Sequence, residues 1–303
     1  MPDTPMCAQQ SKELGESPAG TAPSETEHWI VLQVQAAWGR KAWSSVELPD
    51  AVRRHVDDAL AQVGRARLQL IRRSAAEDDG TLALFVGRST PGRSVLHRYQ
   101  LDRPEQILEV PLVERMVGEP DPEAVWDTPL LLVCVHGTRD RCCARWGAPL
   151  MRALAPHTSD HLWGSSHVGG HRFAPNLLAL PLGALYGRLS VEQAPTVAAA
   201  LMAGRLPGGD TLRGRTCYDR PTQAAEAFLC RAVDHTDLTT VVLDQIAQPI
   251  ADNRWTARFR IHEQLYTVTV ERQPLGAMQS ASCGDPPKPG MTFALVALTP
   301  ASR

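Results

Sequence analysis

Two cysteines and two histidines in this chain have the types and the spacing of a metal-ligand set. Cys134 and Cys143 lie in the segment CVHGTRDRCC, and His167 and His171 lie in the segment SHVGGH. Two thiolates and two imidazoles provide four donors, which can complete a tetrahedral zinc site or hold a [2Fe–2S] cluster. The two cofactors imply different proteins, so the choice between them bears directly on function.

The spacing of the two cysteines favours the larger cofactor. Structural zinc sites usually take cysteine pairs that are two to four residues apart. Here eight residues, including a histidine and three charged side chains, separate Cys134 from Cys143. A loop of this width suits a two-iron cluster better than a single ion.

The surroundings of each cysteine favour the thiolate form that a metal requires. Cys134 lies near the end of the apolar segment TPLLLVCV, and Cys143 directly precedes a helix expected over residues 144–155. The unpaired N–H groups of a helix N-terminus carry partial positive charge, which lowers the pKa of a nearby thiol. Arg139 would add to this effect.

The two histidines are expected to converge from a loop. Gly169 and Gly170 separate them, and two adjacent glycines disfavour a helix by roughly 2 kcal/mol while permitting a tight turn. His136 and Arg139 in the first segment, and Arg172 after the second histidine, are candidates for supporting contacts. Roles in a turn or a solvated surface remain the alternatives for these three.

The elements that must position these residues form two runs of the same order: strand, helix, strand, strand, strand. The second run, which also ends in a helix, resembles a thioredoxin-like arrangement. Alternation of apolar and polar residues and helical spacing predict these elements. The first run has strands at 28–35, 65–73, 81–87 and 94–101 and a helix at 48–63. The second has strands at 128–135, before the histidines, at 176–183 and at 184–189, with helices at 144–155 and 191–204.

The sequence therefore predicts an α/β fold in several parts. A Trp-Gly pair in each run, at 38–39 and 146–147, is a weak sign of internal duplication. If the two runs are related, the first has lost every metal ligand and is a scaffold. The expected parts are a disordered tail (1–27), an N-terminal α/β scaffold unit (28–117), a thioredoxin-like unit bearing the site (128–208) and a small C-terminal α+β domain (209–303).

Composition excludes several classes of protein. The net charge of −2 offers no bulk basicity for nucleic acid, and no apolar run is long enough to span a bilayer. The first residues lack the apolar stretch of a signal peptide. The seven cysteines are an odd, scattered set, which fits a reduced cytoplasmic compartment better than a disulfide framework. Outside the two segments, Cys7, Cys217, Cys230 and Cys283 are expected to be packed or unimportant thiols.

The two metal-ligand segments, read as CVHGTRDRCCARWG and SHVGGHRFAPNLLALPLGALYGRL, resemble the sucrase/ferredoxin-like family, a branch of the thioredoxin-like [2Fe–2S] ferredoxins. The resemblance is best over residues 128–205. It implies a [2Fe–2S] cluster held by Cys134, Cys143, His167 and His171. The sequence contains no convincing pair of catalytic carboxylates that would support the word sucrase.

The adjacent Cys142 and Cys143 leave the second thiolate ligand open. The eight-residue spacing from Cys134 favours Cys143, because the side chains of neighbouring residues point in different directions and only one can face the site. The other is then expected to be a packed thiol.

Three functions are compatible with these residues. The leading one is an electron carrier whose cluster exchanges electrons with a reductase and an acceptor protein. A thioredoxin-like enzyme with Cys134 or Cys142–Cys143 as nucleophile is weaker, because the chain has no Cys-x-x-Cys motif. A zinc-stabilised interaction protein is the third. With no GxGxxG motif in the chain, flavin or nicotinamide chemistry would belong to a partner.

Overall fold

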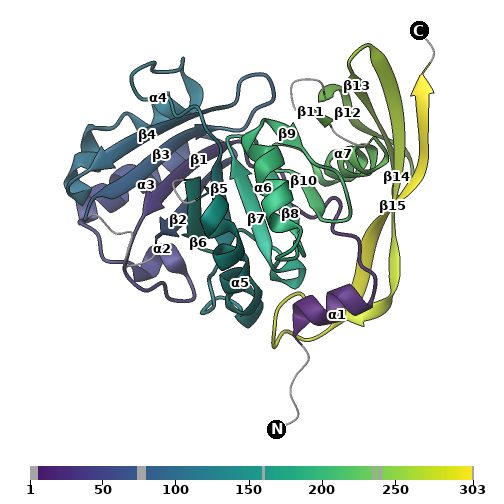
Figure 1. Ribbon diagram of the computed structural model, residues 1–303, viewed down its shortest axis with the longest axis horizontal. Helices are drawn as coiled ribbons and strands as arrows, with labels where there is room; N and C mark the ends of the chain where they lie inside the picture. The colour runs from purple at the N-terminus through teal and green to yellow at the C-terminus, as the bar shows by residue number, and fades with distance from the viewer. Residues whose placement is uncertain (1–5, 74–79, 159–160, 234–235, 238–240, 302–303) are drawn as a thin grey trace.

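Nine strands of this chain join one mixed sheet, which occupies the centre of Figure 1. The structure is a computed structural model that describes residues 6–73, 80–158, 161–233, 236–237 and 241–301. Helices accompany this sheet, and a separate four-stranded antiparallel sheet lies at the C-terminus. Among the described residues, no helix combines the length and the apolar character needed to cross a membrane.

The first half of the large sheet follows the predicted order of elements. Strand β1 pairs in parallel with β2 and antiparallel with β3, and β3 pairs antiparallel with β4. The elements are β1 (His28–Gln33), α2 (Ala42–Ser45), α3 (Asp50–Gln62), β2 (Ala66–Arg72), β3 (Leu82–Arg88), β4 (Val95–Leu101), the 3₁₀ helix η2 (Pro104–Glu109) and α4 (Leu112–Val117).

The second half repeats this connectivity. Strand β5 pairs in parallel with β6 and antiparallel with β7, and β7 pairs antiparallel with β8. The elements are β5 (Leu130–Cys134), α5 (Arg141–Thr158), β6 (Leu162–Ser165), the short 3₁₀ helix η4 (His171–Phe173), β7 (Asn176–Leu180), β8 (Ala184–Gly187) and α6 (Ala194–Met202).

The two halves meet where β2 and β6 pair antiparallel, through Ile71 with Ser165 and Arg72 with Gly164. The strand order is therefore β10-β8-β7-β5-β6-β2-β1-β3-β4. The Trp-Gly pairs do not mark equivalent places, because residues 38–39 lie in a loop and residues 146–147 lie inside α5. The repeated element order, and not this short match, is what relates the halves.

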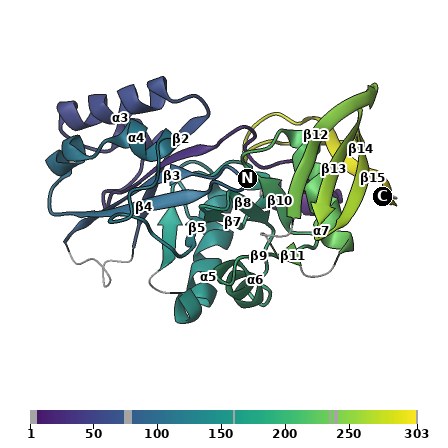
Figure 2. The same cartoon turned by 90° about the horizontal axis from the view of Figure 1, so that it is seen from above.

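Helices cover both sides of the large sheet. Figure 2 shows α3 and α4 on one side and α5 and α6 on the other. Both faces of the central strands are therefore buried: Ile30 and Leu32 of β1 pack in the cluster with α3, and Trp29 and Val31 pack in another. This explains why β1 and β5 are nearly continuous apolar runs instead of alternating ones.

The C-terminal region does not separate cleanly at residue 209. Strand β10 (Leu212–Arg215) pairs with β8 and forms the edge of the large sheet. Beyond it lie α7 (Arg220–Ala232) and the four-stranded sheet β12 (Val241–Ala251), β13 (Arg254–Ile261), β14 (Gln264–Gln279) and β15 (Lys288–Ala301). The short strands β9 (Arg205–Leu206) and β11 (Thr236–Asp237) pair with each other. Strand β12 was not predicted, because most of its residues are exposed and give no apolar pattern.

The expectation of a disordered tail over residues 1–27 is wrong for residues 6–27; residues 1–5 lie outside the described part of the chain. Residues Cys7–Glu13 form the helix α1, and Cys7 and Ser11 are each only 1% exposed. The fully buried carboxylate of Glu16 accepts hydrogen bonds from Ser11 Oγ and from the Arg172 guanidinium, at 3.0 Å for Nη2. The polar residues of this segment, which suggested disorder, therefore provide partners for charged side chains elsewhere in the fold.

Helix α5 lies unusually close to the end of β5. A Cβ atom on Gly147 would be 2.2 Å from the carbonyl oxygen of Cys134, so only glycine allows this approach. The contact fixes the first turn of α5, which holds Cys142 and Cys143, next to the last residue of β5.

Replacing Gly147 by Ala should lower the free energy of unfolding by about 1–3 kcal/mol, because the helix must move away from the strand. In an uncrowded helix the same change would stabilise by up to about 1 kcal/mol. Urea denaturation measures the free energy of unfolding of the variant and of wild type. Gly64→Ala is the control, since a Cβ there meets nothing within 4 Å. Equal stability of the Gly147→Ala variant and wild type would contradict the packing described.

Candidate metal centre

Three of the four predicted ligands form a tight group. The Nδ1 atom of His167 lies 3.9 Å from Sγ of Cys134 and 3.7 Å from Sγ of Cys143. Ligand atoms of the three residues all lie within 4.8 Å of one another, close enough to share a metal ion. Cys134 ends β5, Cys143 lies in the first turn of α5, and His167 follows β6.

The fourth predicted ligand, His171, lies directly behind this group. Its ring stacks on that of His167 with centroids 4.9 Å apart and an interplanar angle of 29°. Its Nε2 atom is 3.6 Å from Oδ2 of Asp140. Its Nδ1 atom is buried and makes no hydrogen bond of normal geometry among the described residues. A buried ring nitrogen without a hydrogen bond of normal geometry is unusual, and it can serve as a ligand for a bound group.

The adjacent cysteines of α5 face different neighbours. Successive residues on a helix differ in direction by about 100°. Cys143 therefore points toward Cys134 and His167, while Cys142 points away toward Cys7 and Cys283, with Sγ–Sγ distances of 3.4 Å to each. Cys142 has no part in the group around His167.

Hydrogen bonding favours the thiolate form of one cysteine in this group. The Cys143 thiol donates to Cys134 and lowers the pKa of Cys134 well below its usual range. Burial opposes this shift, and His167 and the N–H of Val168 reinforce it. The same interaction raises the pKa of Cys143. The interaction therefore favours the thiolate form of Cys134, the form in which cysteine binds metals.

The buried guanidinium of Arg213 holds the histidine loop in place. It donates to the carbonyl of Gly169 at 2.9 Å and to Oδ1 of Asn176 at 2.7 Å, and Asn176 donates to the carbonyl of Gly170 at 3.2 Å. Both glycines have positive φ angles, 97° and 67°. A Cβ on Gly170 would lie 2.2 Å from Nη2 of Arg213. Arg213 and Asn176 were not identified from the sequence, because no motif marks a contact between residues so far apart.

His136 links the histidine loop to the first half of the sheet. Its Nδ1 accepts the N–H of His167 at 3.2 Å, and its Nε2 donates to the carbonyl of Gly39 at 2.8 Å. Burial lowers the pKa of His136, which keeps the ring neutral and able to accept. The ring also packs edge-on against Trp38, with centroids 5.7 Å apart. The supporting contact expected of His136 is therefore present in the structure.

The two arginine candidates lie in different environments. Arg172 is not a solvated surface residue, because it pairs with the buried Glu16. Arg139 and Asp140 form no ion pair within the described part of the chain. The Asp140 carboxylate instead turns inward and accepts the N–H groups of Cys142 at 2.9 Å and Cys283 at 2.8 Å.

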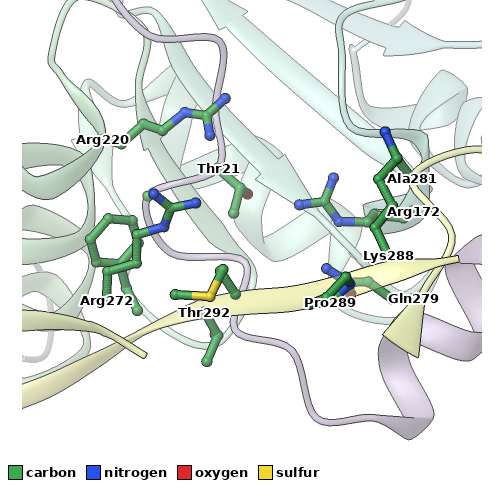
Figure 3. Close-up of a pocket in the computed structure, with 12 residues that line it drawn as sticks. Thr21, Arg172, Arg220, Arg272, Gln279, Ala281, Lys288, Pro289 and Thr292 are labelled. Carbon is green, nitrogen blue, oxygen red and sulfur yellow. The ribbon is translucent and has the colours of Figure 1, made fainter. Parts of the chain in front are cut away.

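A basic cavity of about 210 Å³ opens beside the histidine loop (Figure 3). Four cationic side chains line it and no carboxylate does: Arg172, Arg220, Arg272 and Lys288. A neighbouring cavity of about 350 Å³ shares Arg172 and Arg220 and adds Arg67. A single positive field therefore extends along the surface next to the loop that carries both histidines.

The same segments connect the chain to known proteins. A family model described as Sucrase/ferredoxin-like matches residues 18–214, which include both halves of the large sheet and the whole candidate centre. The chain belongs to the sucrase/ferredoxin-like family. The resemblance seen in the two segments is thereby confirmed, and it extends over more of the chain than residues 128–205. No curated protein and no solved structure gives a significant match.

Replacing Gly170 by Ala in the histidine loop should lower the free energy of unfolding by more than the strain of a positive φ angle alone. A left-handed residue costs an alanine about 1–2 kcal/mol, and the collision with Arg213 adds about 1–3 kcal/mol. Gly204→Ala is the matched control, because Gly204 also has positive φ but a Cβ there meets nothing. The free energy of unfolding, measured by urea denaturation, should fall further in Gly170→Ala than in Gly204→Ala. Equal losses in the two variants would contradict the role of Arg213.

Proposed function

We propose that this member of the sucrase/ferredoxin-like family is an electron-transfer protein whose [2Fe–2S] cluster is held by Cys134, Cys143, His167 and His171. The observation that carries the proposal is the convergence of donors from β5, α5 and the histidine loop, within 4.8 Å for the first three. The buried Nδ1 atom of His171 provides the fourth donor. The chain's membership of a ferredoxin-like family is consistent with an iron–sulfur cluster.

The donor set fits such a cluster chemically. Two thiolates neutralise the charge of an oxidised two-iron core, and neutral imidazoles raise the reduction potential relative to four thiolates. When bound, the cluster supplies one-electron redox chemistry. The residues of the chain bind it and exclude water, since Cys134 and Cys143 are each 1% exposed. His167 is the most exposed of the four, so electrons would enter on the histidine side.

The strand connectivity supports a thioredoxin-like fold for both halves of the sheet. In each half the helix follows the first strand, and the second strand returns parallel to the first. The proposed centre lies where the first strand of the second half meets its helix. The equivalent place in the first half carries no ligand, but its loop contributes Gly39 and Trp38 to the environment of His136.

The basic cavities beside the histidine loop favour a redox partner with an acidic docking surface. Arg220, Arg272 and Lys288 make no ion pair within the described part of the chain, so their charge is available to an incoming protein. Complementary charge accelerates association and orients the partner. A reductase and an acceptor could both use this face in turn.

A thiol enzyme of thioredoxin type is less well supported. The activated thiolate of Cys134 is 1% exposed, and a protein disulfide cannot reach it without opening the fold. A single zinc ion remains the second candidate for this site, because three close donors also suit zinc.

Iron analysis and low-temperature EPR of anaerobically purified protein test the ligand assignment. Cys134→Ser and Cys143→Ser should each lower cluster content at least about tenfold, because even the loss of a supporting contact commonly costs that much. Cys142→Ser should retain the cluster, and Cys217→Ser serves as a buried-thiol control. A colourless protein containing only zinc, or cluster loss in Cys142→Ser with retention in Cys143→Ser, would overturn the assignment.

The role of the basic cavities in electron transfer can be tested without knowing the natural partner. The reduced protein is oxidised with the anion ferricyanide, and the rate is measured. The rate should fall severalfold between about 20 and 500 mM NaCl, because salt screens the attraction. An Arg220→Gln/Arg272→Gln variant should react more slowly at low salt and show a weaker salt dependence. Arg54→Gln, on the exposed face of α3, controls for a general loss of charge. An unchanged rate in the double variant would exclude this face as the entry point.

A further inference from the structure

A second group of cysteines lies on the other side of the first turn of α5. Cys7 of α1, Cys142 of α5 and Cys283, in the loop between β14 and β15, bring their sulfur atoms together. The three Sγ–Sγ distances are 3.4, 3.4 and 3.6 Å. Figure 1 shows the long β14–β15 ribbon reaching α1, which explains how segments so distant in sequence meet.

A carboxylate completes this group. Both oxygens of Asp140 lie 4.0 Å from Sγ of Cys7, and its side chain is fully buried. Oδ2 already accepts the hydroxyl of Ser282 at 2.9 Å and the N–H of Cys283 at 2.8 Å. Oδ1 accepts the N–H of Cys142 at 2.9 Å and faces the Cys7 thiol at 4.0 Å, a long contact that a bound ion could replace.

The spacing of the sulfur atoms matches a single tetrahedral ion. Thiolates bound to one zinc ion at about 2.3 Å lie about 3.8 Å apart. The observed separations differ from this by only a few tenths of an ångström. Thiolates that each bind a different iron of a larger cluster must lie farther apart, so the triangle favours one ion over a second cluster.

The charges of the group also favour a cation. The buried Asp140 carboxylate accepts the N–H groups of Cys283 and Cys142, and these hydrogen bonds stabilise its charged form. This buried carboxylate lies beside the three sulfur atoms, and buried charges in proteins are paired or coordinate metals.

We propose that Cys7, Cys142, Cys283 and Oδ1 of Asp140 form a second metal site, which binds one thiophilic divalent cation of the zinc class. The site is structural, because four protein donors leave no open coordination position. It shares no ligand with the proposed cluster site, although Asp140 also contacts His171.

The bound ion would attach both α1 and the β14–β15 loop to α5. These segments lie next to His171: Glu16, after α1, pairs with the adjacent Arg172, and the loop contacts Asp140, whose Oδ2 lies 3.6 Å from Nε2 of His171. A metal that joins residues this far apart in sequence stabilises the folded chain, because its binding free energy adds to that of folding. The second site would therefore hold α1 and the β14–β15 loop in place beside His171.

Metal analysis of the full-length protein, purified under reducing conditions and equilibrated with zinc, tests the proposal. Wild type should hold about one zinc ion per chain at this site. Cys7→Ser and Cys283→Ala should each lower the zinc bound at this site at least about tenfold, a loss of about one ion per chain whichever metal the first site holds. Cys217→Ser should retain the zinc. Cys283 lies in a half-buried loop, so its variant tests the site without disturbing the core.

A cobalt(II) titration in the Cys134→Ser/Cys143→Ser background separates the two sites. With the first group removed, the thiolate-to-cobalt absorption of a tetrahedral site should persist, and it should disappear when Cys7→Ser is added. Absence of this absorption, or a zinc content that Cys7→Ser and Cys283→Ala leave unchanged, would overturn the proposal. A disulfide between two of the three cysteines in fully reduced, zinc-equilibrated protein, detected by intact mass, would overturn it as well. None of these results depends on whether the first site holds iron.

Discussion

The close approach of α5 to the end of β5 is the constraint on which the cysteine chemistry depends. Because Gly147 has no side chain, the helix can pack against the carbonyl of Cys134, and its first turn then lies beside the strand end. In that position Cys143 faces Cys134 and His167, while Cys142 faces Cys7 and Cys283. One helix turn thus supplies a sulfur to each of two groups, and the divergence of adjacent side chains keeps the groups separate.

Much of the large sheet and the main site could be predicted from the sequence. Strands β1 to β5 and helices α3 and α5 have strong local patterns, and the two ligand segments carry the residues that the structure brings together. The preference for Cys143 as neighbour of Cys134 followed from spacing, and the structure places the two side by side. Whether these residues bind a cluster stays a prediction.

The remaining features depend on contacts that no local pattern encodes. Helix α1 is polar and short, and it is ordered through Glu16 and Arg172, which pair across much of the chain. Cys7 falls in the segment expected to be a disordered tail, and Cys283 falls in a Gly-Pro loop expected to have a structural role, and only folding makes them neighbours. The joining of both halves into one sheet rests on two residue pairs between β2 and β6. Local sequence patterns therefore predict helices and strands well, but they do not predict which distant segments come into contact.

The cover over His171 has a consequence for how the protein matures. The loop that holds Cys283 leaves the ribosome long after β5, α5 and the histidine loop, so the ligand residues emerge and can fold before their cover exists. During that interval a cluster could enter the proposed site. Once the β14–β15 ribbon docks on α1, the proposed site would be closed on this side, and a cluster inserted earlier would be retained. The site would therefore assemble in a fixed order, which is set by the order of the segments in the sequence.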